Sequence, residues 1–357
     1  MREGVNKVAL RLFEHNEKAY HAAIRMMDQY GKAAIVHPTG TGKSYIAFKL
    51  IEDNPETTVL WLSPSEYIFK TQLESLKRND PDFPLANVHF YTYAKLMCCT
   101  QAQLDEIAAQ KPAYIVLDEF HRAGAECWGE STVALLRLCP DAKLLGLTAT
   151  NVRYLDNNRD MAEELFDSCV ASDMTLGEAV VRGILPTPNY VTTVYQYQKT
   201  LAKYQARVDN LRTPGIQDAN QKYLDAPNTD KAFADFKMDT SDRLKLLFCI
   251  DMLNEGVHVE GISGVILFRP TISPIVYKQQ IGRALTAGDN TIPLILDVVN
   301  NFEGLTSISG LQSEMQEAVH RLYANGEGDK IVTERFEVIE QVHDCLLYTS
   351  PSPRDTR

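Results

Sequence analysis

A short glycine-rich segment near the start of the chain could bind phosphate. It reads Pro38-Thr39-Gly40-Thr41-Gly42-Lys43-Ser44 and lies between an apolar run at 33–36 and an amphipathic stretch at 45–51. Glycines let a backbone curl so that its N–H groups face phosphate oxygens, and a following helix adds the positive end of its dipole. Lys43 would reach the β- and γ-phosphates of a nucleotide, and the Ser44 hydroxyl would bind Mg²⁺. A glycine-rich turn without a ligand is the alternative for this segment taken alone.

Two adjacent carboxylates could complete a magnesium site beside that loop. Residues 113–117 read as a buried strand, and Asp118-Glu119 follow it directly. The carboxyl end of a parallel strand is where a Mg²⁺ partner for a phosphate-binding loop belongs. We therefore expect Asp118 to serve Mg²⁺, directly or through water, and Glu119 to act as the base that orients or deprotonates the attacking water. A solvated strand end is the alternative for this pair considered by itself.

Strand and helix signals alternate along the chain and predict an α/β fold with a doubly wound, mostly parallel sheet. Residues 1–30 are expected to be helical. Apolar runs predict strands at 33–36, 58–62, 88–91, 113–117 and 143–147, and amphipathic stretches predict helices at 44–52, 66–77, 101–109 and 130–138. A further strand is predicted at 190–195. A polar stretch begins at residue 196, in which a helix is expected at 197–212. The alternation then resumes with predicted strands at 244–250, 264–268 and 293–299 and a helix at 311–323.

The composition fits a chain of two ordinary domains in a reducing compartment. The 357 residues are 45% hydrophobic, and no apolar run is long enough to cross a membrane. The seven cysteines form no CxxC pair and are odd in number, which favours a cytoplasmic protein without a zinc site. The net charge of −11 argues weakly against a nucleic-acid partner but leaves room for a local basic groove.

Three further motifs follow the loop and the acid pair in a fixed order. They are Gly146-Leu147-Thr148-Ala149-Thr150, the run LNEGVHV at 253–259, and the run YKQQIGRAL at 277–285. Each is weak alone, but with this order the chain resembles superfamily 2 helicases and translocases of the DExH type. It is most similar to DEAD/DEAH-box helicases related to restriction-enzyme motor subunits and to helicases of bacterial mobile elements. The resemblance covers about residues 8–343 and implies two RecA-like lobes with ATP between them and nucleic acid across both.

The resemblance also implies a role for each matching residue. Lys43, Asp118, Glu119 and Arg283 would be catalytic, and Arg283 would be the arginine finger that stabilises charge on the transferred phosphoryl group. Gly256 and Gln279 would join the phosphate-binding loop around ATP, while His121, Thr148 and Thr150 would couple hydrolysis to lobe movement. Ser63, Pro64, Thr92, Tyr93 and His258 would contact nucleic acid. Helix capping remains the alternative for Ser63 and Thr92, and a surface ion pair remains the alternative for Arg283.

The chain departs from the family pattern at several positions. His37 stands where the strict loop pattern has glycine. Glu17 stands where related motors place a glutamine that reads adenine, and a carboxylate cannot donate to the adenine ring, so Asn16 is a possible substitute. Thr286 stands where many relatives carry a second arginine. Arg283 is therefore the one cationic group of this motif that would stabilise the charge on the transferred phosphoryl group.

The second lobe is short for a RecA-like unit. We expect an ATP-binding lobe at 1–185, a second lobe at 186–305, a helical extension at 306–345, and a non-native or disordered tail at 346–357. No aliphatic strand is visible between Tyr195 and Leu244, and residues 223–226 meet 227–230 as if two remote segments had been joined. We therefore expect an internal deletion near Ala226, with a compact natural variant as the alternative. The tail at 346–357 resembles translated adapter sequence.

These observations predict a motor that uses ATP and Mg²⁺ and moves along nucleic acid, with DNA favoured over RNA. A duplex translocase that never separates the strands is a close alternative. No nuclease motif is evident, so nuclease or methyltransferase activity would belong to partner subunits. The alternative from another class is an inactive or truncated nucleotide-binding module that binds ATP without unwinding.

Overall fold

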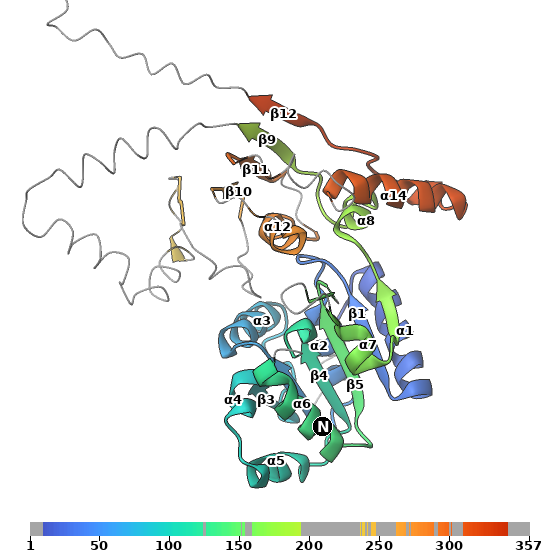
Figure 1. The fold of residues 1–357 in the computed structure, drawn as a ribbon, viewed down its shortest axis with the longest axis vertical. Helices are drawn as coiled ribbons and strands as arrows, with labels where there is room; N and C mark the ends of the chain where they lie inside the picture. The colour runs from blue at the N-terminus through green and yellow to red at the C-terminus, as the bar shows by residue number, and fades with distance from the viewer. Residues whose placement is uncertain are drawn as a thin grey trace, which may run out of the picture.

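The computed structural model places two parallel sheets at the two ends of the view in Figure 1. It describes residues 10–123, 126–150, 152–153, 159–193, 262–268, 273–288, 292–299 and 310–341, with residues 236, 238–239, 241, 244–247, 271 and 301 between them. The predicted α/β class with two RecA-like lobes is confirmed by these sheets, of which the second is the smaller. The helix predicted at 197–212 and the junction near Ala226 lie outside the described residues.

The first lobe contains a six-stranded sheet in the order β3-β2-β4-β5-β1-β8, and all neighbouring strands are parallel. Its strands are β1 (Lys32–Val36), β2 (Val59–Ser63), β3 (Val88–Thr92), β4 (Tyr114–Asp118), β5 (Lys143–Thr148) and β8 (Val170–Asp173). The first five agree with the predicted strands. The sixth was not predicted, because Val-Ala-Ser-Asp is short and half polar and pairs along one edge only.

Helices cover both faces of this sheet because side chains along each buried strand alternate between the faces. Ile35 packs in the core shared with α1 (Glu14–Tyr30), α2 (Ser44–Asp53) and α3 (Glu66–Asn79). Its neighbours Ala34 and Val36 pack in the core on the opposite face. That face is covered by α4 (Tyr93–Met97), α5 (Gln101–Ala108), α6 (Glu126–Leu138) and α7 (Met161–Phe166).

Sequence signals explain where several helices begin and end. Gly31 ends α1 with a φ of 76°, a left-handed conformation that glycine adopts without steric cost. Ser65 caps α3 by accepting a hydrogen bond from the Ile68 N–H. Thr100 and Gln103 form a capping box at the start of α5. The remaining short elements are a 3₁₀ turn at Phe120–Arg122, the antiparallel pair β6 (Val152–Arg153) and β7 (Arg159–Asp160), and a 3₁₀ turn at Gly328–Lys330.

The second lobe contains a four-stranded parallel sheet in the order β10-β11-β9-β12. Its strands are β9 (Asn189–Thr193), β10 (Gly264–Leu267), β11 (Leu294–Asp297) and β12 (Val338–Gln341). One face packs against α8 (Leu176–Val181), α12 (Pro274–Ile281) and α14 (Leu311–Ala324). Gly177 lets α8 lie directly against α14, because a Cβ there would come within 2.5 Å of the Met315 backbone nitrogen.

The two faces of this second sheet differ sharply. The row Val265, Ile295, Tyr190 and Val338 faces the helices and belongs to the core of the lobe. The next row across the same strands, Ile266, Leu296, Val191 and Ile339, faces the other way. Ile266 is 38% exposed and Ile339 is 49% exposed. Parallel sheets are normally buried on both faces, so the exposure of these apolar side chains is unusual for a parallel sheet.

The second lobe also corrects three predictions. Residues 244–247, part of a predicted strand, form neither strand nor helix, and Leu244 is 86% exposed. The segment predicted as a helical extension contains a strand, β12, which pairs with β9 inside the sheet. The core of the second lobe begins at Met174, before the predicted boundary at residue 185, because α8 packs on α14.

Candidate active site

The strand order of the first sheet brings the predicted catalytic segments to one edge. Strand β5 lies between β1 and β4, and all three run in the same direction. The phosphate-binding loop follows β1, Thr148 ends β5, and the acid pair ends β4. Because the carboxyl ends of parallel strands meet at one edge, the loop and the carboxylates become neighbours although they are far apart in sequence.

The loop has the curled backbone that phosphate binding requires. Gly40 and Gly42 have φ values of 89° and 77°, in the left-handed region. A Cβ on Gly40 would lie 1.9 Å from the carbonyl oxygen of Leu285, and the Ala287 N–H donates to the Gly40 carbonyl at 2.9 Å. Glycine at position 40 therefore serves both the turn and the close approach of the second lobe.

Lys43 reaches from the loop to the end of β4, where a polar network surrounds Glu119. Lys43 Nζ lies 3.2 Å from Glu119 Oε1, and His121 Nδ1 lies 3.4 Å from Glu119 Oε2. The Thr148 hydroxyl lies 3.4 Å from Glu119 Oε2, 2.8 Å from His121 Nδ1 and 2.7 Å from the Thr150 carbonyl oxygen. The structure thus connects the predicted base with all three residues that were predicted to couple hydrolysis to movement.

The backbone and charge of Glu119 are both unusual. Its φ and ψ are both 50°, a left-handed conformation that is uncommon for a residue with a side chain and that often marks functional sites. Burial raises the pKa of Glu119, but the charge of Lys43 and the hydrogen bond from His121 lower it by more. The net pKa therefore lies well below the usual range, and the carboxylate is ionised at neutral pH.

Asp118 is buried beside it and responds differently. Burial, and then the neighbouring charge of Glu119, raise the pKa of Asp118 to about 6. Gln72 donates from Nε2 to Asp118 Oδ2 at 3.0 Å, and the Tyr93 hydroxyl donates to the Asp118 carbonyl at 2.9 Å. Asp118 is thus held at the floor of the site as an oxygen donor suited to a hard cation such as Mg²⁺.

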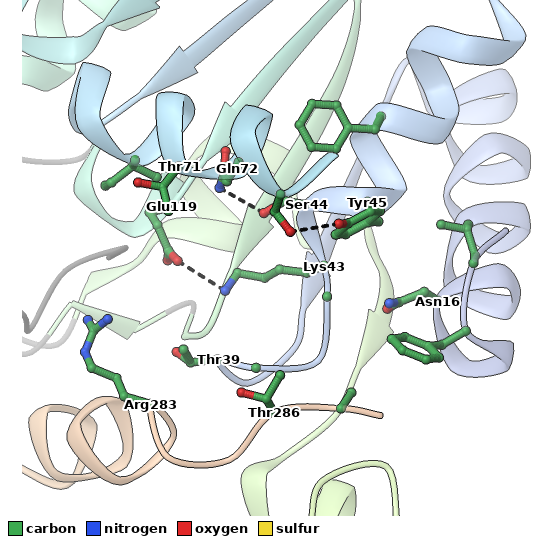
Figure 2. Close-up of a pocket in the computed structure, with 18 of the residues that line it drawn as sticks. Asn16, Thr39, Lys43, Ser44, Tyr45, Thr71, Gln72, Glu119, Arg283 and Thr286 are labelled. Carbon is green, nitrogen blue, oxygen red and sulfur yellow. Dashed lines mark hydrogen bonds and ion pairs between the residues drawn. The ribbon is translucent and has the colours of Figure 1, made fainter. Parts of the chain in front are cut away.

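A cavity of about 430 Å³ joins these groups to residues of the second lobe. Gln279 lies in α12, Arg283 in the turn after it, and Thr286 just beyond, and all three line the cavity together with Lys43 and Glu119. Figure 2 shows Arg283 pointing from the second lobe into the space below Lys43 and Glu119. The cavity therefore has walls from both lobes, as expected for a nucleotide held between them.

The outer wall of the cavity offers a flat apolar surface and an amide. Phe13 and Asn16 both line it. Asn16 donates from Nδ2 to the Thr41 carbonyl at 2.7 Å, and its buried Oδ1 has no hydrogen-bond partner. Glu17, predicted to read adenine, is exposed and does not line the cavity. Asn16, the substitute considered from the sequence, lines the cavity instead, because adjacent residues of a helix point about 100° apart.

His37, the departure from the glycine pattern, is a buried part of the first lobe. Its Nε2 lies 2.8 Å from the Ser172 hydroxyl, and its ring is 6.2 Å from that of His15. Burial first, and then the positive charges of neighbouring groups, lower the pKa of His37 to about 3. The ring is therefore neutral at physiological pH and packs β1 against β8 rather than contributing a charge to the loop.

We expect His37 to make the first lobe sensitive to acid. Between the ordinary pKa of 6.5 and the folded value of about 3, the unfolded chain binds a proton that the folded chain does not. This contribution to stability is present above pH 6.5 and is lost as pH falls, by up to about 1.4 kcal/mol per pH unit. Denaturant titrations between pH 7 and pH 5 should show a shallower fall for H37Q than for the wild type. The exposed-histidine control H21Q should keep the wild-type slope, and an equal slope for H37Q would refute the assignment.

The predicted nucleic-acid contacts are only partly accessible. Ser63 and Tyr93 are fully buried, so their side chains are not presented to solvent here, and their contact with nucleic acid stays a prediction. Tyr93 is turned inward to bond Asp118, while Thr92 caps α4 by accepting from the Lys95 N–H, the capping alternative considered above. Pro64 lines the cavity. Gly256 and His258 lie outside the described residues.

Several residues that line the cavity were not assigned from the sequence, among them Arg11, Phe13 and Gln72. Phe13 and Arg11 line the cavity from the segment before and at the start of α1, and Gln72 lies at its floor. Sequence offered a signal only for Phe13, an aromatic residue three positions before Asn16. Gln72 is one polar residue on an amphipathic helix, which is no signal by itself.

Among the residues that the structure describes, no helix has the length and apolar character of a membrane span. The same residues contain no group of three or more histidine, cysteine, aspartate or glutamate side chains arranged to hold a metal ion. Mg²⁺ bound with a nucleotide usually takes few protein ligands, and the side chains here that would serve it are Ser44 and Asp118.

Two family models match the chain, one in each lobe. The model of the res subunit of type III restriction enzymes matches residues 9–153. The model of the helicase conserved C-terminal domain matches residues 190–288. A "51.5 kDa protein" of a Lactococcus phage (isolate 7-9) is 23% identical over 313 residues, which cover 75% of this chain and 66% of that protein. The match extends over 313 positions, but this chain contributes only 75% of its 357 residues to it. At the remaining positions the phage protein has residues that this chain lacks.

Solved structures share the two-lobed fold at low identity. The ATP-dependent Type ISP restriction-modification enzyme LlaBIII bound to DNA matches with a TM-score of 0.59 and 14% identity, over 94% of this chain and 31% of that enzyme. S. cerevisiae Dbp5 bound to RNA and ADP BeF3 matches with a TM-score of 0.50 and 15% identity, over 93% of this chain and 94% of Dbp5. At such identities the matches establish the fold alone. The chain spans about two thirds of the phage protein and less than a third of the restriction enzyme.

Proposed function

Because its two lobes are the paired domains of superfamily 2 helicases, the chain belongs to that superfamily, and we propose that it is an ATP-driven motor on nucleic acid. The observation that carries the proposal is the cavity between the lobes. It gathers Lys43 and Glu119 from the first lobe and Arg283 from the second. A site completed only when two lobes meet can couple hydrolysis to movement of one lobe against the other.

The side chains suit Mg²⁺-ATP in type and placement. The loop offers backbone N–H groups for phosphates, and Ser44 and Asp118 offer oxygens for Mg²⁺. Bound Mg²⁺-ATP would supply the phosphoanhydride bond and the charge that polarises it. Phe13 offers a ring face to the base, and Asn16 offers the unpartnered Oδ1 as an acceptor for an adenine amino group. Glu17 is not part of this proposal.

Glu119 changes its proton affinity when its partners change. In this structure Lys43 and His121 stabilise the carboxylate. A phosphate group that draws Lys43 toward itself would remove the positive charge that most lowers the pKa of Glu119, and that pKa would rise. The base therefore becomes a better proton acceptor when the nucleotide is in place. His121 Nδ1 and the Thr148 hydroxyl each lie 3.4 Å from Glu119 Oε2, and Glu119 lines the cavity.

Nucleic acid is the partner that we propose for the motor. The restriction enzyme matched in structure is bound to DNA and the yeast protein is bound to RNA, and we favour DNA because the first-lobe model is that of a restriction-enzyme subunit. We further propose that the motor works with nuclease or methyltransferase partner subunits, because its first lobe matches the model of a restriction-enzyme subunit.

Strand-displacement assays test what the motor does on nucleic acid. Release of a labelled strand from a partial duplex reports unwinding, and displacement of the third strand of a DNA triplex reports translocation along an intact duplex. The proposal expects ATP-dependent activity in at least one assay with DNA, and less with matched RNA. Activity on RNA alone would move the assignment to RNA, and no activity in either assay would reject movement.

A second candidate function is a truncated nucleotide-binding module. Two observations favour it: the open apolar face of the second sheet, with Ile266 and Ile339 exposed, and the longer matched region of the phage protein. We propose that the chain lacks a segment of the second lobe near Ala226, which would otherwise cover this face. An uncovered apolar sheet is also an aggregation hazard.

Insertion at Ala226 of a strand-and-helix segment from the second lobe of a superfamily 2 helicase separates the two candidates. If the chain is a truncated motor, the insertion should raise thermal stability, reduce aggregation and increase hydrolysis stimulated by DNA. If the second lobe is a compact natural variant, the insertion should destabilise the protein and leave stimulation unchanged or lower.

A further inference from the structure

Gln72 lies between the two oxygens that are suited to hold Mg²⁺. Its Nε2 lies 2.9 Å from Ser44 Oγ and 3.0 Å from Asp118 Oδ2, and Figure 2 shows the side chain reaching down to Ser44. An amide N–H carries partial positive charge. It therefore interacts with these oxygens as a weak substitute for the cation that they would otherwise share.

The carbonyl end of the same amide lacks a partner. Gln72 Oε1 is buried and forms no hydrogen bond. Buried acceptors are nearly always paired, and the exceptions ask for an explanation such as an ion or a water. A Mg²⁺ ion at a nucleotide keeps several of its waters, and these are strong hydrogen-bond donors. An amide can present either its donor or its acceptor to one place by turning through about 180° at its last torsion.

The helix that carries Gln72 is fixed, so only the side chain can respond. Ile68, Thr71 and Leu76 on α3 are buried, and Phe69 packs against Trp61 with ring centroids 5.4 Å apart. A polar group on a well-packed helix is placed more reproducibly than one on a loop. Gln72 itself lines the cavity, so its amide is a group of α3 that faces the metal site.

We propose that Gln72 is a positioning residue for the metal, with a different contact in each state. Without metal, Nε2 holds the Ser44 hydroxyl and the Asp118 carboxylate together. With Mg²⁺ bound, Oε1 accepts a hydrogen bond from a water on the ion and orients its hydration shell. The inference rests on the proposed function, since it requires that Mg²⁺ and nucleotide bind at this site.

Two substitutions separate the donor from the acceptor. Q72L removes both, whereas Q72E keeps an acceptor oxygen and loses the donor. E74Q changes an exposed side chain on the same helix and serves as the matched control. The measurement is the apparent Mg²⁺ affinity of the full chain, from titrations of Mg²⁺ into protein and a fluorescent ADP analogue after EDTA treatment. Thermal melting in EDTA checks that each variant is folded.

The proposal expects Q72L to weaken the apparent Mg²⁺ affinity by about 10- to 100-fold, as is typical for groups that orient metal-bound ligands. ADP affinity without Mg²⁺ should not change. E74Q should keep the wild-type Mg²⁺ affinity, and Q72E, whose carboxylate accepts the same hydrogen bond and adds a negative charge, should bind Mg²⁺ at least as tightly as the wild type. Wild-type or tighter Mg²⁺ binding by Q72L would overturn the proposal, because the amide would then be a mere competitor of the ion or a structural contact.

The same titration distinguishes failure of the proposed function. If the wild-type chain binds no ADP, or binds it without any effect of Mg²⁺, both proposals fall. If the wild type binds ADP in a Mg²⁺-dependent way and Q72L behaves identically, only the role of Gln72 is lost.

Discussion

Replacing Arg283 by alanine is expected to lower the rate of ATP hydrolysis by about 10³- to 10⁵-fold, the range known for arginine fingers in related phosphoryl transfer. Arg283 lines the cavity from the turn after α12, while Lys43 and Glu119 line it from the first lobe. A planar guanidinium can hold two oxygens of a phosphoryl group whose charge grows in the transition state.

Arg11 and Arg122 also line the cavity, but both belong to the first lobe, so neither can supply a positive charge from the second lobe as Arg283 does. Thr286, where relatives carry a second arginine, also lines the cavity, but its hydroxyl carries no charge. ATP binding by R283A should be weakened much less than turnover, because the effect is specific to the transition state.

Steady-state hydrolysis and equilibrium binding of a fluorescent ATP analogue measure these two effects separately. R283K keeps the charge but not the forked geometry and should recover only part of the activity. R335A removes an exposed arginine of the second lobe and should behave as the wild type. Hydrolysis by R283A near the wild-type rate would show that Arg283 is an ordinary ion-pairing residue.

Replacing Glu119 by glutamine is expected to lower hydrolysis by about 10²- to 10⁴-fold while ATP still binds. Glutamine keeps the size and the hydrogen-bonding capacity of the side chain but cannot accept the proton of the attacking water. The ion pair with Lys43, 3.2 Å long, is lost in this variant. Lys43 is then left to the phosphates, so ATP affinity should hold or increase.

Single-turnover hydrolysis and ATP affinity should therefore move in different directions for E119Q. The exposed carboxylate Glu106 on α5 provides the matched control, and E106Q should hydrolyse ATP as the wild type does. A folded E119Q that binds ATP and turns it over normally would remove Glu119 as the base.

Much of the first lobe could be predicted because its signals are local. Short apolar runs bounded by polar residues gave β1, β2, β4 and β5, since a strand buried on both faces has no polar alternation. The meeting of Lys43 with Glu119 followed from one rule, that parallel strands end at a common edge. Strands β8 and β12 could not be found in this way because Val-Ala-Ser-Asp and Val-Ile-Glu-Gln are short and half polar.

The direction of individual side chains was harder to predict than the strand or helix that carries them. Ser63 and Tyr93 stand at strand ends, as expected, but both point inward. Asn16 and Glu17 are neighbours on α1, and only one of them lines the cavity. A sequence pattern does not show which one, because the answer depends on how α1 packs against the loop. The contacts of Gln72 depend on three elements, α2, α3 and β4, and no spacing in the sequence connects them.

The most direct test of the central claim is the ATP hydrolysis rate with and without single- and double-stranded DNA, for the wild type beside E119Q. A motor on DNA should hydrolyse ATP faster when DNA is added, and E119Q should abolish the stimulated rate. The strand form that stimulates more would identify the track. ATP binding without any stimulation by DNA would contradict the account, and the chain would then be a nucleotide-binding module whose second lobe does not function.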